Sequence, residues 1–214
     1  MPIKTLSRRD LLKAAGITLA ALGVTCSGTG YLMTRVSEVE TPKYIFEKDN
    51  TMINRILVTY ATRAGSTVDV AAAIGETLSG RDFNVDVKSV KDNPPLDNYK
   101  AVIIGSAVRM GSWLPEALNF VKSNQEALKK LPVALFSVHM ANTADDETSR
   151  SNRLAYLKAI RPLLDPVDEA FFGGKMDFSR LSFLDRVICR LLKSQEEDRR
   201  QWDKIRGWGQ TILA

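Results

Sequence analysis

The chain has 214 residues, 44% of them hydrophobic, and a formal charge of +5, which fits one ordinary domain with an extension. Cysteine occurs only at Cys26 and Cys189, and histidine only at His139, so neither a disulfide framework nor a Cys- or His-rich metal site can form. Basic and acidic residues are mixed along the chain, so no nucleic-acid partner is expected, and redox chemistry would need an organic cofactor.

The N-terminus carries an export-type pattern. Ser7-Arg8-Arg9-Asp10-Leu11-Leu12-Lys13 precedes the uncharged stretch from Ala14 to Met33, and together they resemble a twin-arginine export signal. No Ala-x-Ala cleavage site follows, and about 20 apolar residues can span a bilayer as a helix. We therefore expect residues 1–36 to form a signal that is retained as a membrane anchor, and residues 37–53 to form a polar linker.

With such an export signal, we expect the remaining domain, residues 54–214, to lie at the outer (periplasmic) face of the cytoplasmic membrane. An alternative is lipidation at Cys26, because Val24-Thr25-Cys26 faintly resembles a lipoprotein cleavage site.

Five strands are predicted in the body of the chain, with helices between them. Short apolar runs at residues 55–60, 100–105 and 132–138 are typical of buried parallel strands. Residues 83–90 alternate between polar and apolar, which favours an edge strand with one wet face, and residues 169–174 are a weaker fifth candidate. Apolar residues at helical spacing predict helices over 67–78 and 115–131.

Strands that alternate with helices form βαβ crossovers, which place a parallel sheet between two helical layers. We therefore predict an α/β fold, a doubly wound three-layer sandwich with a five-stranded parallel sheet, preceded by the N-terminal apolar helix. In such a sheet the ligand lies beyond the carboxyl ends of the strands.

The first candidate loop, Thr62-Arg63-Ala64-Gly65-Ser66-Thr67, leaves the first strand and enters the first helix. Backbone N–H groups and hydroxyls at a helix N-terminus can bind a phosphate without a lysine. The loop contains neither a Gly-Lys-Ser/Thr nor a Gly-x-Gly-x-x-Gly motif, which argues against nucleoside triphosphates and dinucleotides. The alternative is that Ser66 or Thr67 only caps the helix.

The order Thr-x-x-Gly-x-Thr between a strand and a helix resembles the phosphate loop of the flavodoxin family. That resemblance implies the strand order 2-1-3-4-5 and FMN as the cofactor, with its 5′-phosphate held by Thr62 through Thr67. Arg63 and Ala64 depart from the family, in which a further Ser or Thr is frequent, so loss of flavin binding is an alternative.

Two further loops correspond to the flavodoxin segments beside the flavin ring. The second loop follows the third strand, and Trp113 or Met110 could supply an apolar surface for the ring. Its alternative is that Trp113 packs at the entrance of the next helix, and Arg109 could either face the ring edge or face solvent. The third loop follows the fourth strand and contains the single histidine. The candidate ring contacts are Ser106, Ala107, Val108, Arg109, Met110, Gly111, Trp113, Ser137, Val138 and His139.

The resemblance narrows further at three segments: Gly105–Gly111, Phe172–Asp177 and Glu197–Asp203 look like the flavodoxin-like protoporphyrinogen oxidase group. It implies an FMN-dependent oxidoreductase that removes hydrogen from a reduced organic substrate and passes electrons to a quinone. The alternative is an exported carrier that passes electrons between redox partner proteins. Phe178–Lys193 mixes apolar and basic residues, which fits a membrane-surface helix or an ordinary packed helix. No catalytic residue is assigned, and no metal is expected.

Overall fold

The computed structural model describes residues 42–47, 54–180, 186 and 195–213. The predicted export signal at residues 1–36 lies outside these ranges. Of the predicted segment Phe178–Lys193, the structure describes only the short 3-10 helix η2 (Phe178–Arg180) and Arg186. Among the described residues no helix has the length and apolar character needed to cross a bilayer.

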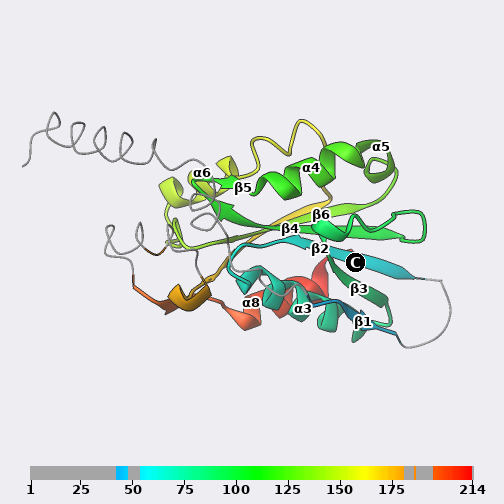
Figure 1. The fold of residues 1–214 in the computed structure, drawn as a ribbon, viewed down its shortest axis with the longest axis horizontal. Coiled ribbons are helices and arrows are strands. Elements are labelled where there is room, and N and C mark those ends of the chain that lie inside the picture. The colour runs from blue at the N-terminus through cyan, green and yellow to red at the C-terminus, as the bar shows by residue number, and fades with distance from the viewer. Residues whose placement is uncertain (1–41, 48–53, 181–185, 187–194, 214) are drawn as a thin grey trace, which may run out of the picture.

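A parallel sheet of five strands forms the centre of the domain (Figure 1). In chain order its members are β2 (Arg55–Ala61), β3 (Asn84–Ser89), β4 (Ala101–Arg109), β6 (Val133–His139) and β7 (Asp168–Gly173). They lie side by side as β3-β2-β4-β6-β7, and every neighbouring pair is parallel. The predicted α/β class and the order 2-1-3-4-5 are confirmed.

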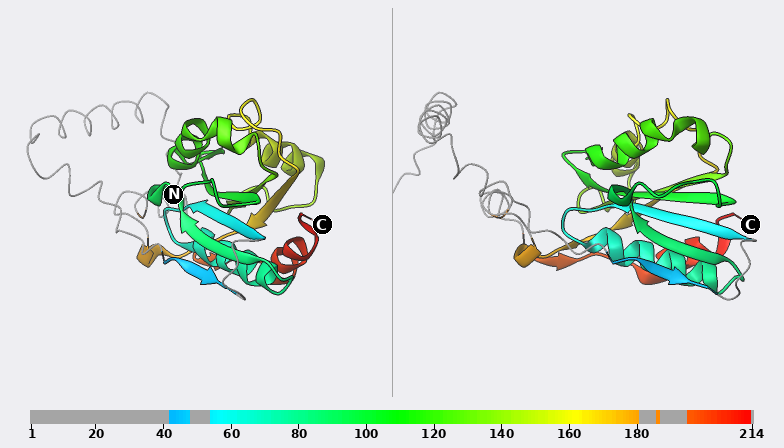
Figure 2. Two further views of the ribbon diagram at one scale, coloured as in Figure 1. Left: turned by 90° about the vertical axis from the view of Figure 1, so that its right-hand side faces the viewer. Right: turned by 45° about the vertical axis from the view of Figure 1, so that its right-hand side comes forward.

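Helices cover both faces of the sheet (Figures 1 and 2). One layer contains α3 (Ser66–Ser79) and α8 (Trp202–Thr211), and the other contains α4 (Pro115–Ser123), α5 (Gln125–Leu128) and α6 (Glu147–Ala155). The single helix predicted over 115–131 is divided because the Asn124 side chain donates to the Phe120 carbonyl and Asn124 leaves the helical conformation. Asparagine commonly ends helices by such local hydrogen bonds.

The edge of the sheet differs from the sequence-based prediction. A short strand, β1 (Tyr44–Phe46), pairs antiparallel with β3, although these residues fall in the range predicted as a linker. As a result β3 is not an edge strand with a wet face. The polar residues that suggested such a face, Asn84 and Asp86, are 3% and 2% exposed.

A polar network explains how β3 buries a carboxylate. The Asp86 carboxylate accepts hydrogen bonds from Tyr99 Oη at 2.5 Å and Lys88 Nζ at 2.7 Å, and from Arg55 Nη1 at 3.1 Å. Burial alone would raise the pKa of Asp86, but the bonds from Lys88 and Tyr99 and the charge of Arg55 hold it below its usual value. The alternating pattern of β3 therefore contains a carboxylate that is buried and paired. Sequence periodicity alone cannot distinguish such a carboxylate from one that is exposed to solvent.

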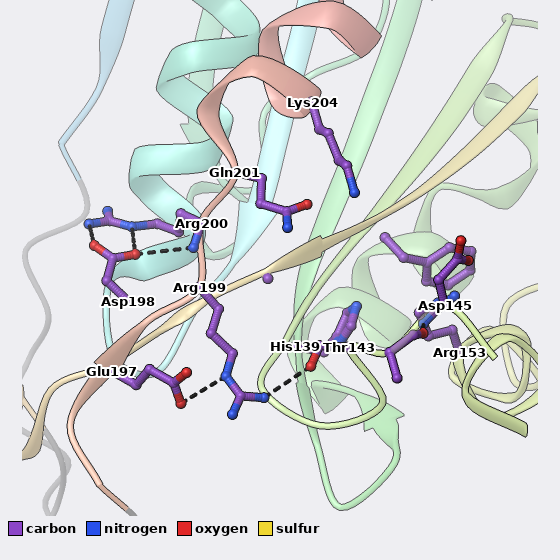
Figure 3. A pocket seen from close by; sticks show the side chains of 13 residues that line it. His139, Thr143, Asp145, Arg153, Glu197, Asp198, Arg199, Arg200, Gln201 and Lys204 are labelled. Atoms are coloured by element: carbon purple, nitrogen blue, oxygen red, sulfur yellow. Dashed lines mark hydrogen bonds and ion pairs between the residues drawn. The ribbon is translucent and has the colours of Figure 1, made fainter.

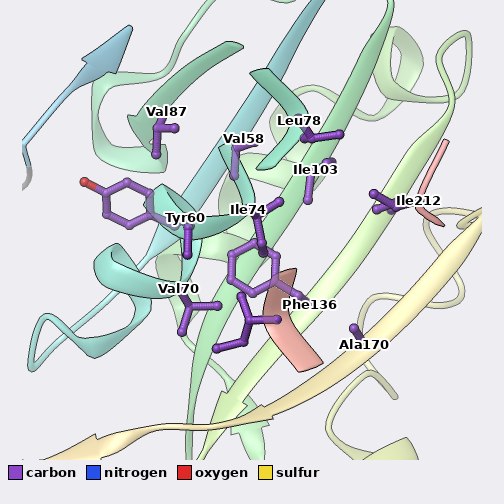
Figure 4. Packing of buried hydrophobic residues seen from close by; sticks show 14 of the residues in the cluster. Val58, Tyr60, Val70, Ile74, Leu78, Val87, Ile103, Phe136, Ala170 and Ile212 are labelled. Carbon is purple, nitrogen blue, oxygen red and sulfur yellow. The ribbon is translucent and has the colours of Figure 1, made fainter. Parts of the chain in front are cut away.

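The core on the α3 and α8 side is organised around the ring of Phe136 (Figure 4). Tyr60 and Ile74 are fully buried in the same cluster. On β4, a Cβ at Gly105 would lie 1.9 Å from Phe136 Cζ, so only glycine leaves room for this ring. The packing holds β2, β4 and β6 in register, and it fixes where their carboxyl ends lie.

Candidate functional site

The strands β2, β4 and β6 are adjacent and parallel, so their carboxyl ends lie at one edge of the sheet. The three predicted loops begin at these ends. The site is therefore assembled from segments that are far apart in the sequence but neighbours in the sheet, as the doubly wound fold requires.

The first loop closes on itself before α3 begins. Thr62 Oγ1 accepts a hydrogen bond from the Gly65 backbone N–H at 3.0 Å, and Gly65 takes a left-handed conformation with φ of 89°. Gly65 is the N-cap of α3, and no side chain caps the helix. The alternative that Ser66 or Thr67 serves as the cap is therefore wrong. A left-handed residue at a helix start turns successive N–H groups toward one point, which suits an anion.

The Thr67 hydroxyl is the most informative atom of this loop. Its side chain is fully buried, yet Oγ1 has no hydrogen-bond partner in the protein. A buried hydroxyl left unpaired costs about 1–3 kcal/mol, so such atoms in folded proteins usually serve a ligand or a water molecule. At the N-terminus of α3, this hydroxyl and the N–H groups of Ser66 and Thr67 fit a phosphate group, whereas the Val68 N–H already donates to the Gly65 carbonyl at 3.0 Å.

The side chain of Arg63 connects this loop to a neighbouring helix through an ion pair. Its Nη2 pairs with Glu116 Oε1 at 2.6 Å, in the first turn of α4. Ala64 is half-buried and contributes no hydroxyl. The ion pair joins the first loop to the helix that follows the second candidate segment, so the two segments are positioned together.

The second segment is mostly a strand rather than a loop. Gly105 through Arg109 continue β4, and β5 (Ser112–Trp113) folds back antiparallel onto its end, with Val108 opposite Trp113. The hairpin tip is Met110 and Gly111, both with positive φ. The prediction of a loop directly after the third strand is corrected, because β4 continues through Ala107 and Val108 to Arg109 and there pairs with β5.

Two side chains of this segment have structural partners. Trp113 is 6% exposed and its Nε1 donates to Ser137 Oγ at 2.8 Å, while Ser106 Oγ accepts from the Leu114 N–H at 3.0 Å. Trp113 thus packs beside the start of α4, as the alternative interpretation had it, rather than facing an open ring site. Met110 is 91% exposed, and it remains the apolar side chain available at the tip.

The third segment places Ser137 and Val138 within β6 and His139 at its end. The imidazole is 4% exposed, and its Nδ1 lies 2.5 Å from the Ala141 carbonyl oxygen. Because a carbonyl only accepts, Nδ1 carries the proton and Nε2 is left as an acceptor. Burial, followed by the charges of Arg153 and Arg199, lowers the pKa of His139, so the ring is neutral near pH 7.

A fourth segment lies at the same edge; parts of it carried the family resemblance in the sequence, but none of its residues was assigned to the site. Gly174 donates its N–H to the His139 carbonyl at 2.9 Å and accepts from the Arg199 N–H at 2.9 Å. A Cβ at Gly173 would lie 2.2 Å from the Arg199 carbonyl oxygen, and a Cβ at Gly174 would lie 3.0 Å from Val138 Cγ1. Arg200 Nη1 pairs with Asp69 Oδ2 at 2.6 Å, in the first turns of α3. The Gly173-Gly174 pair was the available signal, since close approach of two backbones requires glycine.

A polar cavity of about 790 Å³ opens beside this fourth segment (Figure 3). Its lining includes His139 and residues from β7, from α6 and from the chain between β9 (Glu197–Asp198) and α8. None of the residues from Thr62 to Thr67 lines it. Among the described residues, no three His, Cys, Asp or Glu side chains gather as a metal site would require.

The sequence of the chain is similar to those of known proteins. Residues 57–203 match the family model described as the flavodoxin domain. The protoporphyrinogen IX dehydrogenase [quinone] of Escherichia coli K12 is 25% identical over 170 residues, which cover 74% of this chain and 94% of that protein. The protein of the same name from Leishmania major is 27% identical over 142 residues, covering 64% and 62%.

Solved flavodoxins are also similar to the chain. A flavodoxin from the domain Archaea is 20% identical, with a TM-score of 0.41, over 65% of this chain and 99% of that one. A flavodoxin of Fusobacterium nucleatum bound to flavin mononucleotide is 18% identical, with a TM-score of 0.40, over 52% and 67%.

Proposed function

The chain belongs to the flavodoxin domain family, and from that premise we propose that it is an FMN-dependent oxidoreductase which oxidises a reduced organic substrate and passes the electrons to a quinone. FMN is the cofactor of this domain, and when bound it supplies the electron and hydrogen transfer that no side chain here provides. The observation that carries the proposal is the partnerless Thr67 hydroxyl at the glycine-capped start of α3.

The chain's own residues have distinct tasks in this proposal. Thr67 Oγ1 and the first two N–H groups of α3 hold the phosphate, while Thr62 keeps the loop closed through its bond to Gly65. The Arg63–Glu116 pair fixes the loop relative to α4. Met110 at the hairpin tip offers an apolar, polarisable contact for a flat ring, and His139 lies at the end of the neighbouring strand.

Within this class, protoporphyrinogen IX is the substrate we propose, with a menaquinone as acceptor. The support is the activity named for the Escherichia coli relative, which is aligned over 94% of its own length. The alternative is an electron carrier that docks to other redox proteins. Met110, 91% exposed at the hairpin tip, is an apolar contact that such a partner would meet.

The proposed phosphate site is tested by two threonines of one helix. Thr67→Ala removes a hydroxyl that has no protein partner, so we expect the stability of the flavin-free protein to hold while FMN affinity falls roughly tenfold. Thr77→Ala is the matched control, since Thr77 Oγ1 donates to the Ala73 carbonyl at 2.8 Å in the same helix. That control should lose stability but keep its FMN affinity.

Both quantities are measurable on the full chain in detergent, by quenching of FMN fluorescence on binding and by urea unfolding. Equal FMN affinity of Thr67→Ala and the unmodified protein would show that the phosphate is bound elsewhere. If neither protein binds FMN, the family's cofactor has been lost in this chain.

The substrate is tested by anaerobic mixing of the FMN-loaded protein with protoporphyrinogen and a menaquinone analogue. Oxidation should produce porphyrin fluorescence at a rate above the enzyme-free control and dependent on the quinone. If no fluorescence develops, while a redox partner protein still exchanges electrons with the bound flavin, the carrier function replaces the oxidase.

We also propose that the N-terminal pattern exports the folded domain and anchors it at the outer face of the cytoplasmic membrane. Replacing Arg8 and Arg9 by lysine removes the arginine pair but keeps the charge, so the domain should be retained in the cytoplasm. Protease added outside spheroplasts should digest the unmodified protein and spare this variant. Equal digestion of both would contradict the export proposal.

A further inference from the structure

The polar cavity beside β7 is separate from the phosphate loop and is suited to a ligand of its own. Its volume of about 790 Å³ falls within the range of small-molecule sites in proteins. It is bounded by the chain after β6, by the end of β7 and by the chain from β9 into α8, and no residue of the first two candidate segments lines it.

The charges that line the cavity leave an excess of one cation. Four cationic side chains and three anionic ones take part. Arg199 pairs with Glu197 at 2.8 Å, Arg200 pairs with both Asp198 and Asp69, and Asp145 pairs with Arg150. The remaining cations are therefore those without a carboxylate partner, and they decide which ligand the cavity prefers.

Two cations are left. Arg153 donates to the backbone carbonyls of Asn142 and Ala144, which do not neutralise its charge. Lys204 makes no hydrogen bond or ion pair with any other described residue, although its charge and that of Arg153 act on Asp145 across the cavity, and Figure 3 shows its side chain extending from α8 toward the cavity. Lys204 is thus placed to meet an anionic group.

The cavity also contains an acceptor of fixed orientation. His139 lines it, and because the Ala141 carbonyl holds the proton on Nδ1, Nε2 presents a lone pair. The ring is held further by Tyr156, whose centroid lies 5.5 Å away. A ligand group that donates an N–H or O–H would satisfy Nε2.

We propose that this cavity binds a small organic carboxylate that also carries an N–H or O–H donor, with Lys204 holding the carboxylate and His139 Nε2 accepting the donor. The inference goes beyond the proposed function, because the site requires neither FMN nor the phosphate loop. A carboxylate fits better than a phosphate, since the lining has four cationic and three anionic side chains and its net charge is balanced by a single negative charge rather than by a dianion.

The single histidine makes the site directly observable by NMR. In the full chain with its cofactor, purified without a histidine tag and labelled with ¹³C-histidine, one imidazole Cε1–H signal reports on His139. Titration with 4-hydroxybenzoate, which carries a carboxylate and an O–H, should move this signal saturably. The neutral isostere 4-hydroxybenzamide and inorganic phosphate should not move it at the same concentrations.

Lys204→Gln should weaken 4-hydroxybenzoate binding roughly tenfold, as expected when a charged hydrogen-bond donor is lost. Lys204 is exposed, so the variant should fold, and Lys130→Gln, at an exposed position in the turn after α5, is the matched control with unchanged affinity. A signal that never saturates, an equal response to phosphate, or equal affinity of the Lys204 and Lys130 variants would each overturn the proposal. None of these readouts measures oxidase activity, so they are independent of the proposed substrate.

Discussion

His139 lies at the end of β6 with its imidazole enclosed between a backbone carbonyl, the ring of Tyr156 and the guanidinium groups of Arg153 and Arg199. Burial is the largest cause of its lowered pKa, and the two arginine charges act in the same direction. The bond from Nδ1 to the Ala141 carbonyl opposes them, but it also selects the tautomer. These surroundings therefore keep the His139 imidazole neutral, with Nε2 as a hydrogen-bond acceptor.

A lowered pKa makes stability depend on pH in a defined direction. Between the folded pKa and the unfolded value near 6.5, the unfolded chain binds more protons, so the free energy of unfolding should fall as the pH falls through this window. His139→Gln should remove that part of the dependence. Urea unfolding of both proteins above and below pH 6.5 measures the difference.

The NMR titration of His139 provides the control for this prediction, since the folded pKa is read from one signal. A folded pKa at or above 6.5, or the same pH dependence in His139→Gln, would show that the ring is solvated in the folded protein.

At the residue scale, the sequence predicted which residues lie near the carboxyl ends of the strands better than it predicted the partner of each side chain. Thr62, Gly65 and Thr67 were predicted from the resemblance of their spacing to the flavodoxin phosphate loop, because hydroxyl residues at a helix start can equally serve as caps. Trp113 could not be assigned, because its hydrogen-bond partner, Ser137, lies 24 residues away on the neighbouring strand. His139 was recognised only by its position after a strand, whereas its tautomer depends on a loop carbonyl.

Among the elements, the five parallel strands followed from apolar runs, but the edge of the sheet did not. β1 has three residues, which is too short for a periodic pattern of apolar residues to be seen. The strand is recognisable only from its pairing with β3. Phe46 of this strand packs where α3 has Gly75, since a Cβ there would lie 3.2 Å from Phe46 Cε2 and 2.7 Å from Val87 Cγ2. The edge strand is thus fixed by contacts across the whole layer.

If β1 is an integral element, its inward-facing side chain should matter and its outward-facing one should not. Phe46 is half-buried against the core, so Phe46→Ala should lower the free energy of unfolding by about 2 kcal/mol, roughly half the cost of a fully buried ring. Ile45, 59% exposed on the same strand, is the matched control, and Ile45→Ala should change stability by less than about 0.5 kcal/mol.

Urea unfolding monitored by tryptophan fluorescence gives both values. A negligible effect of Phe46→Ala would mean that β1 detaches readily, and that residues 42–47 belong functionally to the linker as the sequence alone suggested.

At the scale of the whole molecule, the proposed FMN site joins segments that follow three strands, while α8 packs beside α3 in the same helical layer. Arg81 Nη1 donates to the carbonyls of Gly209 and Ile212, and Trp208 Nε1 donates to Asp168 at 3.0 Å, which ties the C-terminal helix to α3 and to β7. A ligand bound at the N-terminus of α3 therefore contacts a helix that is linked to α8 and, through α8, to β7. Binding of the ligand should therefore raise the free energy of unfolding of the whole domain.

This linkage predicts a rise in melting temperature when FMN is added. At a free FMN concentration one hundred times its Kd, binding to the folded state alone stabilises it by about 2.7 kcal/mol, which is roughly 5 to 10 °C for a domain of this size. Thr67→Ala, with a tenfold weaker affinity, should retain about half of that increment at the same FMN concentration. Thr77→Ala should melt lower without FMN but gain the full increment, because its lost hydroxyl bond to Ala73 belongs to the helix and not to the ligand. Thermal melts of the three proteins with and without FMN separate these cases, and an identical increment in all three would place the cofactor away from the start of α3.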